Sequence, residues 1–145
     1  MKSTYKKLNL DFDAEPNAPN PIVTENSESL SLTFLLNPFI WDNVKDDEQA
    51  KLIFNKVYAY RIGSPGSDNF KDFRYFDSEI DNYGFYQIEN SKWKSDFPDD
   101  KKIVNNTFVD SSDLNHFVFF FRDNTFECIA NEYEFIRTGK IYLEK

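Results

Sequence analysis

The chain has 145 residues, a length that suits a single domain and leaves little room for a second independent core. Apolar residues make up 40% of the sequence and aromatic residues 18%, a composition that argues against intrinsic disorder and favours β-sheet over helix. Acidic residues outnumber basic residues by 25 to 17, and the net charge of −8 disfavours nucleic-acid binding, which needs a basic face to neutralise phosphates.

The first 28 residues predict an extended polar lead-in to the main domain. Residues 13–28 contain three prolines among Asn, Glu and Ser, and proline restricts both its own φ angle and its predecessor's conformation. Residues 1–16 lack the apolar region of a signal peptide, and no apolar run reaches the ~18 residues of a membrane span. We therefore expect a cytoplasmic protein without membrane contact, whose single β-rich domain covers residues 29–145.

Two segments near the start of this domain alternate apolar and polar residues, as strands do. In residues 29–36, Leu30, Leu32 and Phe34 alternate with serine and threonine, which predicts a strand with one buried face. For residues 51–63 we predict one strand, whose apolar face carries Leu52, Phe54, Tyr58, Tyr60 and Ile62. This strand ends at residues 63–66, because proline followed by glycine suits a type II turn.

The second half of the chain contains four more strand candidates. Residues 70–77 and 83–90 are rich in aromatic residues, residues 103–109 form a weaker candidate, and residues 140–144 form the last one. Helix signals are weak, because no stretch keeps apolar residues at i, i+3, i+4 and i+7 for three turns. The pattern predicts a mainly β fold, an antiparallel sandwich or half-open barrel of six to eight short strands with minor helices; an α+β arrangement is the alternative.

The clearest local prediction is a β-hairpin in residues 116–130. Asp123-Asn124 tolerates positive φ angles and suits a two-residue loop. This register pairs Phe121 with Phe126, so that one face of the hairpin is wholly apolar and the other, which carries Glu127, is mixed. Because a slip of one residue would exchange the faces, we expect a well-specified register and a hairpin covered on both sides.

Nucleophilic catalysis and metal chemistry have little basis in the sequence. His116 is the only histidine, and a Ser-His-Asp triad or a dyad with Cys128 would need it as the base. In the predicted hairpin, His116 and Cys128 lie on opposite faces, and His116 lies beyond the last residue pair. We therefore expect an ordinary strand-end histidine and a small buried thiol. One Cys and one His cannot form a typical zinc site, and no glycine-rich phosphate loop occurs. The sequence predicts a protein that is not an enzyme and has no metal or cofactor.

Two weaker hypotheses concern oxygen ligands and tryptophans. Residues 77–82 bring three acids and an asparagine close together, but their spacing differs from an EF-hand and is typical of a solvated loop. Trp41 and Trp93 are residues of the type that stacks on sugars or bases, although a tryptophan more often packs a loop onto a sheet. A carboxylate pair for glycoside hydrolysis can be drawn anywhere among 25 acids, so that pattern has no specificity.

The acidic residues concentrate in predicted loops, and this pattern suits an interface. A rigid β scaffold with carboxylates on several loops has a negative field that steers a basic partner toward it. Aromatic residues between the acids supply rigid anchors for such a contact. The alternative is that this charge only keeps the domain in solution. The predicted partner-binding residues are Asp68, Asp72, Asp77, Glu79, Asp81, Tyr83, Trp93, Asp99 and Asp100.

A strand, a short element with Ser and Trp, and a terminal hairpin follow one another in the sequence. They are KLIFNKVYAYRIGSPG at residues 51–66, IENSKW at residues 88–93, and HFVFFFRDNTFECIANEYEF at residues 116–135. In these stretches, which cover about a third of the chain, the sequence resembles small acidic immunity proteins of bacterial polymorphic and contact-dependent toxin systems. The resemblance implies an antidote that binds a cognate toxin domain and blocks its active site, without turnover or cofactor. It transfers no binding residues, because such proteins contact their toxins through variable loops.

A function of another class is the alternative to this antidote. A β-barrel or sandwich could bind a small apolar or sugar ligand, because the 16 phenylalanines could line a cavity as easily as fill a core. A search for a cavity among these phenylalanines separates the two hypotheses.

Overall fold

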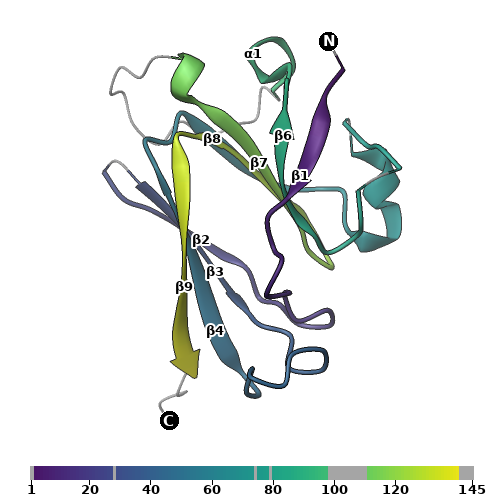
Figure 1. Cartoon of the computed structure of the whole chain (residues 1–145), viewed down its shortest axis with the longest axis vertical. Coiled ribbons are helices and arrows are strands. Elements are labelled where there is room, and N and C mark those ends of the chain that lie inside the picture. Colours follow the sequence, from purple (N-terminus) through teal and green to yellow (C-terminus); the bar gives the residue numbers. More distant parts are fainter. Residues whose placement is uncertain (1, 28, 74, 79, 98–110, 141–145) are drawn as a thin grey trace.

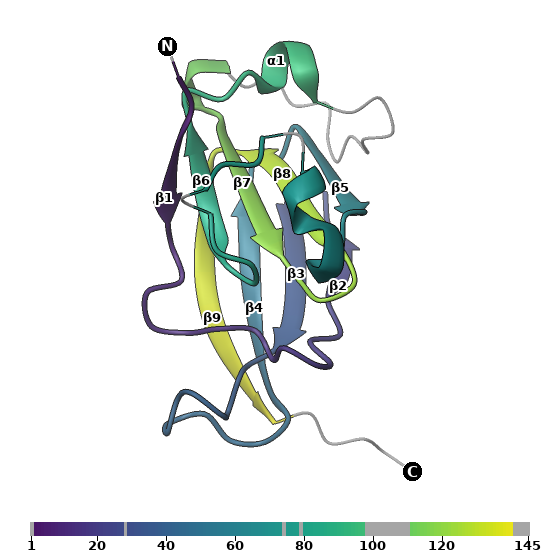
Figure 2. The ribbon, with the colours of Figure 1, turned by 90° about the vertical axis from the view of Figure 1, so that its right-hand side faces the viewer.

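The computed structural model describes residues 2–27, 29–73, 75–78, 80–97 and 111–140. Two antiparallel β-sheets, one of five strands and one of four, pack face to face as a sandwich (Figure 1). Figure 2 shows the five-stranded sheet with the helical turn of residues 67–72 in front of its outer face and α1 at its upper end. The elements are β1 (Thr4–Lys7), β2 (Ile22–Glu25), β3 (Ser29–Leu35), β4 (Glu48–Asn55), β5 (Ala59–Gly63), the 3-10 helix η1 (Ser67–Asp72), β6 (Phe85–Glu89), α1 (Trp93–Asp96), the 3-10 helix η2 (Ser111–Asp113), β7 (Asn115–Phe120), β8 (Thr125–Ala130) and β9 (Glu132–Lys140).

The lead-in contributes one edge strand to each sheet. β1 pairs with β6 in a sheet of order β1-β6-β7-β8-β5, and β2 pairs with β3 in a sheet of order β2-β3-β4-β9. Between these strands, Phe12 and Ala14 are buried in the core. The predicted mainly β, antiparallel sandwich is confirmed, with nine strands among the described residues instead of six to eight. Edge strands of four residues are too short to produce a periodic pattern in the sequence.

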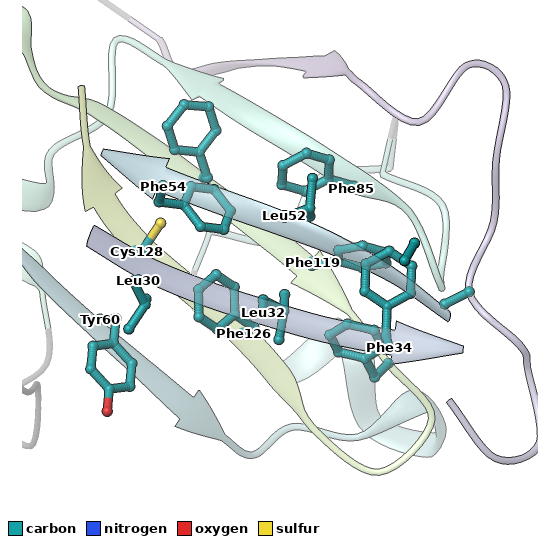
Figure 3. Close-up of a cluster of buried hydrophobic side chains, with 14 of the residues drawn as sticks. Leu30, Leu32, Phe34, Leu52, Phe54, Tyr60, Phe85, Phe119, Phe126 and Cys128 are labelled. Atoms are coloured by element: carbon teal, nitrogen blue, oxygen red, sulfur yellow. The ribbon is translucent and has the colours of Figure 1, made fainter. Parts of the chain in front are cut away.

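The core lies between the two sheets and is filled mainly by phenylalanine. Leu30, Leu32 and Phe34 on β3 are buried, as the alternation predicts. Phe54 on β4 meets Phe126 on β8 across the core, with ring centroids 5.5 Å apart (Figure 3). Because tilted rings attract one another through their quadrupoles, such contacts add to the stabilisation that comes from burying apolar area.

The prediction of one strand for residues 51–63 is wrong. The segment contains β4 and β5, which belong to different sheets. Lys56, between them, has a φ of 52°, a left-handed conformation that turns the chain from one sheet to the other. Leu52 and Tyr60 reach the same core from opposite sides, but the alternation breaks at the turn, where Val57 is buried and Tyr58, predicted on the apolar face, is 41% exposed.

The prediction of a strand for residues 70–77 is also wrong, because the segment begins in η1 and continues as turns. Phe70, Phe73 and Phe76 are spaced three residues apart. Because a 3-10 helix has three residues per turn, this spacing places the three rings on one side of the segment. All three pack against the outer face of the five-stranded sheet. The neighbouring prediction for residues 83–90 is confirmed by β6.

The hairpin predicted in residues 116–130 is present, but its register differs from the prediction by two residues. Phe126 pairs with Phe119 instead of Phe121, and the loop spans residues 121–124. Phe121 is 1% exposed and stacks on Phe119 at 4.3 Å, so burial of this ring in the core favours the longer loop. Because a slip of two residues leaves every side chain on its own face, the predicted faces are confirmed while the pairing is wrong.

Two other predicted strands fall on residues outside those described. Residues 103–109 lie wholly outside them, and of residues 140–144 only the first, at the end of β9, lies inside. Within the described ranges, no helix has the length and apolar character needed to cross a membrane.

Candidate functional site

The connection between β5 and β6, residues 64–84, carries most of the predicted partner-binding acids. Its Phe73 and Ile80 are buried with Val118 and Phe120 on the outer face of the five-stranded sheet. The rings of Phe73 and Phe120 meet edge-on, with centroids 5.2 Å apart. In Figure 1 this β5–β6 connection (teal, on the right) lies on the side of the sheet that faces away from the four-stranded sheet. It is a packed layer on the sandwich, not a loose loop.

Hydrogen bonds hold the β5–β6 connection on the sheet. The Ser67 N–H donates to the Arg122 carbonyl at 2.7 Å, and the Thr125 hydroxyl donates to the Pro65 carbonyl at 2.7 Å. Asn82 Nδ2 donates to the Ser67 carbonyl at 2.9 Å, which ties the two ends of the connection together. Its carboxylates are therefore presented from a fixed backbone, and a partner that binds them has less conformational entropy to remove.

The predicted acids on this connection differ in what they contact. Asp68 and Asp72 lie on η1, are exposed, and make no ion pair within the described part of the chain. Asp77 and Asp81 lie close to lysines of the N-terminal segment. Ion pairs whose lysine is exposed stabilise by about 0–1 kcal/mol, so these lysines reduce the local negative charge but hold little structure. The two pairs are Lys2 with Asp77 and Lys7 with Asp81, each at 3.9 Å.

A surface hollow of about 370 Å³ lies beside η1. Its lining includes Asp72 and Asn69 of η1, Arg61 of β5, and the turn of residues 64–66. This hollow gives a partner a concave contact next to the two exposed carboxylates of η1.

The remaining predicted site residues lie elsewhere. Tyr83 is half-buried in the turn before β6 and has a φ of 70°. Trp93 lies on α1, packs on Tyr58 with ring centroids 5.4 Å apart, and covers a different part of the same sheet. Trp41 also acts as an anchor, since its Nε1 donates to Asp13 Oδ2 at 2.9 Å and its ring packs on the core. The other predicted residues, Glu79, Asp99 and Asp100, lie outside the described residues.

The oxygen-ligand hypothesis for residues 77–82 finds no support in the part of the chain that the structure describes. No group of three or more His, Cys, Asp or Glu side chains there could hold a metal ion. The polar groups of the segment serve its own packing: the Asp81 N–H donates to the Tyr86 hydroxyl at 2.7 Å, and Asn82 bonds to Ser67.

The aromatic core is filled by its own rings. Phe34, Phe85 and Phe119 are at most 1% exposed, and the ring of Phe119 lies 5.0 Å from Phe34 and 5.2 Å from Phe85 (Figure 3). The hollows beside η1, beside α1 and beside the β3–β4 loop lie at the surface, and no ring of this central cluster lines them. The alternative of an aromatic-lined ligand pocket therefore draws no support from the core.

A chain of polar side chains is buried on the outer face of the five-stranded sheet. His116 lies between the ring of Tyr75, from the β5–β6 connection, and that of Phe97, which follows α1, with centroids 5.5 and 5.9 Å away. Its Nδ1 is 2.6 Å from Ser91 Oγ, and its Nε2 is 2.9 Å from Glu127 Oε1. The side chains of His116 and Glu127 have 0% exposure. These hydrogen bonds join a hydroxyl from the segment after β6, an imidazole from β7 and a carboxylate from β8.

The predicted hairpin register keeps His116 and Glu127 apart. The predicted pairing placed Glu127 opposite Phe120, whereas the observed pairing places it opposite Val118. His116, opposite Ile129, is then the diagonal neighbour of Glu127 on the same face, within reach of a long side chain. It also lies within the pairing, and the expectation that it lies beyond the end is wrong. A histidine and a glutamate on one face of a hairpin were the available signal.

The thiol of Cys128 does not contact Ser91, His116 or Glu127. It lies on the inner face of β8, opposite to that of His116 as predicted, and is fully buried in the core. Burial, with a smaller contribution from the neighbouring Glu127, raises the pKa of the thiol well above its ordinary value. Since a thiolate is the reactive form of cysteine, a Cys-His dyad has no geometric basis here.

Comparisons of the chain with protein-family models, curated proteins and solved structures find no match. The molecule is an antiparallel β-sandwich with an acidic connection packed on one outer face and the hydrogen-bonded Ser91, His116 and Glu127 beside it. Its function is accordingly inferred from these surfaces and contacts.

Proposed function

We propose that this chain is a protein-binding module that blocks a basic partner domain, as an antidote blocks a toxin. The observation that carries the proposal is the exposure of Asp68 and Asp72 on a connection whose backbone is held against the sheet. Neither carboxylate is neutralised by an ion pair among the described residues, and the net charge of −8 extends the negative field around the molecule. The three stretches that resemble immunity proteins of bacterial toxin systems support the same class.

Such a module acts by charge complementarity and steric cover, without turnover. Carboxylates on an ordered support attract a cationic surface before contact and increase its association rate by about 10- to 1000-fold. After contact, the bulk of the sandwich covers the partner's cleft, and the hollow beside η1 receives part of the partner's surface. A nuclease domain fits this charge pattern best, because its cleft must be basic to bind nucleic acid.

Co-expression tests the proposal with a defined partner. The product of the gene adjacent to the one for this chain is expressed alone and together with the chain, and growth of the host is measured. We expect growth arrest by the adjacent product alone, rescue by the chain, and a one-to-one complex in size-exclusion chromatography. An adjacent product that is harmless, or that stays toxic when the chain is present, would show that the antidote proposal is wrong.

A charge reversal on η1 tests the position of the interface. Asp68→Lys combined with Asp72→Lys should lower the association rate about tenfold at low ionic strength and weaken its dependence on salt. The matched control is Glu132→Lys combined with Glu134→Lys, which changes the net charge equally at exposed positions of β9 in the other sheet. Equal slowing by the two pairs would mean that only net charge matters and that η1 lies outside the interface.

A further inference from the structure

Ser91, His116 and Glu127 form their hydrogen-bonded chain beside a surface hollow. Ser91 follows β6 and is half-buried, whereas His116 on β7 and Glu127 on β8 have no exposed side-chain surface. The hollow has a volume of about 280 Å³, and its lining includes Ser91, His116 and Trp93. A hydroxyl at a hollow, followed inward by an imidazole and a carboxylate, is the composition of a serine triad.

The buried carboxylate determines which nitrogen of His116 carries the proton. Ionised Glu127 can only accept hydrogen bonds, so its 2.9 Å contact requires His116 Nε2 to donate. The neutral ring then has its lone pair on Nδ1, which faces the Ser91 hydroxyl at 2.6 Å. Ser91 therefore donates to His116, and this is the direction of transfer that a general base needs.

Two further contacts suit a reactive hydroxyl. The Trp93 N–H donates to Ser91 Oγ at 3.2 Å and would stabilise the negative charge that grows on this oxygen as its proton leaves. Arg61 Nη1 lies 3.7 Å from Glu127 Oε2, which places a positive charge beside this buried carboxylate. The two ring nitrogens of His116 exchange the roles they have in the chymotrypsin triad, but the order of the proton transfers is the same.

We propose that Ser91 is a nucleophile and His116 its general base in an acyl-transfer site for small uncharged esters. The substrate is small because the hollow is about 280 Å³, and it is not anionic because Glu89 is part of the lining. Glu127 is a positioning residue that sets the tautomer of His116. This inference goes beyond the proposed binding function and departs from the expectation of a protein that is not an enzyme. The two proposals rest on different residues, and either can fail without the other.

The reaction needs only the ester and water. Ser91 Oγ attacks the ester carbonyl carbon while its proton passes to His116 Nδ1. The tetrahedral adduct then collapses, the bond to the alcohol breaks, and the alcohol leaves with the proton from Nδ1, so that Ser91 is acylated. Water attacks the acyl group with His116 again as base, which releases the carboxylic acid and restores the hydroxyl.

The tautomer of His116 gives a test that does not depend on activity. Because His116 is the only histidine in the chain, its imidazole ¹⁵N resonances in the NMR spectrum need no assignment to a residue. We expect a protonated Nε2 and an unprotonated Nδ1 at neutral pH. A protonated Nδ1 would make Ser91 an acceptor that only caps the first turn of α1, and this result would overturn the proposal.

Labelling of the serine tests the chemistry directly. A fluorophosphonate probe should modify the intact protein at Ser91, as found by peptide mass spectrometry, and Ser91→Ala should abolish the label. The matched control is Ser95→Ala, since Ser95 is an exposed serine on α1, four residues after Ser91, and its hydroxyl bonds to Lys92 and Asp96. Hydrolysis of p-nitrophenyl acetate should be at least about a hundredfold faster in wild type than in Ser91→Ala. No label on folded wild type, or equal labelling of both variants, would overturn the proposal.

A thiol at the same position gives a second chemical readout. The thiol introduced by Ser91→Cys should react with iodoacetamide at pH 7 at least about tenfold faster than the one introduced by Ser95→Cys, because His116 accepts its proton. Native Cys128 is fully buried and adds no background. Equal rates at the two positions would show that His116 does not act as a base toward residue 91, against the proposal.

Discussion

Replacement of Phe119 by alanine should lower the stability strongly, because its ring lies at the centre of the core. Phe119 has 0% exposure, and its ring lies 4.3 Å from that of Phe121, 5.0 Å from Phe34 and 5.2 Å from Phe85. Burial of such a side chain is worth about 1.5–3 kcal/mol. The cavity left among rings that collapse only partly adds to this loss, so we expect a decrease of about 4 kcal/mol in the free energy of unfolding.

The same chemical change at an exposed position provides the control. Phe39 is 73% exposed, and Phe39→Ala should change the free energy of unfolding by less than about 0.5 kcal/mol. Urea unfolding measures both values, and Phe119→Ala should also lower the melting temperature by roughly 12–16 °C, at about 3–4 °C per kcal/mol. A loss of less than about 1 kcal/mol for Phe119→Ala would refute the argument that the core is filled and would favour the ligand-binding alternative.

Three further predictions concern an ion pair, the thiol and a close backbone contact. Arg137→Met should destabilise by roughly 2 kcal/mol at pH 7, because Arg137 donates to the buried Glu48 carboxylate at 2.5 and 2.6 Å and is itself partly exposed. These hydrogen bonds lower the pKa of Glu48 below its ordinary 4.5, so the stabilisation is present above that value and is lost as the pH falls through the lowered pKa. Urea unfolding curves of wild type and variant should therefore converge in acid, and a constant difference would contradict this assignment. Cys128, whose thiol has a raised pKa, should react with iodoacetamide in concentrated urea but not in the native protein, where rapid modification would contradict its burial. Gly66→Ala should destabilise by about 1–3 kcal/mol in thermal unfolding, since its Cβ would lie 2.9 Å from the Arg122 carbonyl oxygen; a variant as stable as wild type would show that the β5–β6 connection can shift.

Local alternation of residue types was enough to predict which side chains of the clear strands face the core. Leu30, Leu32 and Phe34 on β3 are buried as predicted, and so is the apolar face of the β7–β8 hairpin. These predictions hold because side chains alternate between the two faces of a strand, whatever its neighbours are. The exposure of Asp68 and Asp72 likewise follows from their polar character, although the predicted strand of residues 70–77, which includes Asp72, is replaced by η1 and turns.

Composition and a period of two residues are therefore sufficient to predict the class of fold and the buried face of each clear strand. The partner of each strand depends on contacts between distant segments. Burial of Phe121 moved the hairpin register by two residues, and the turn at Lys56 divided one apparent strand between two sheets. The contact of Ser91, His116 and Glu127 likewise depends on how distant segments pack together. Contacts between distant segments depend on how the whole core packs, and no local pattern of residues contains that information.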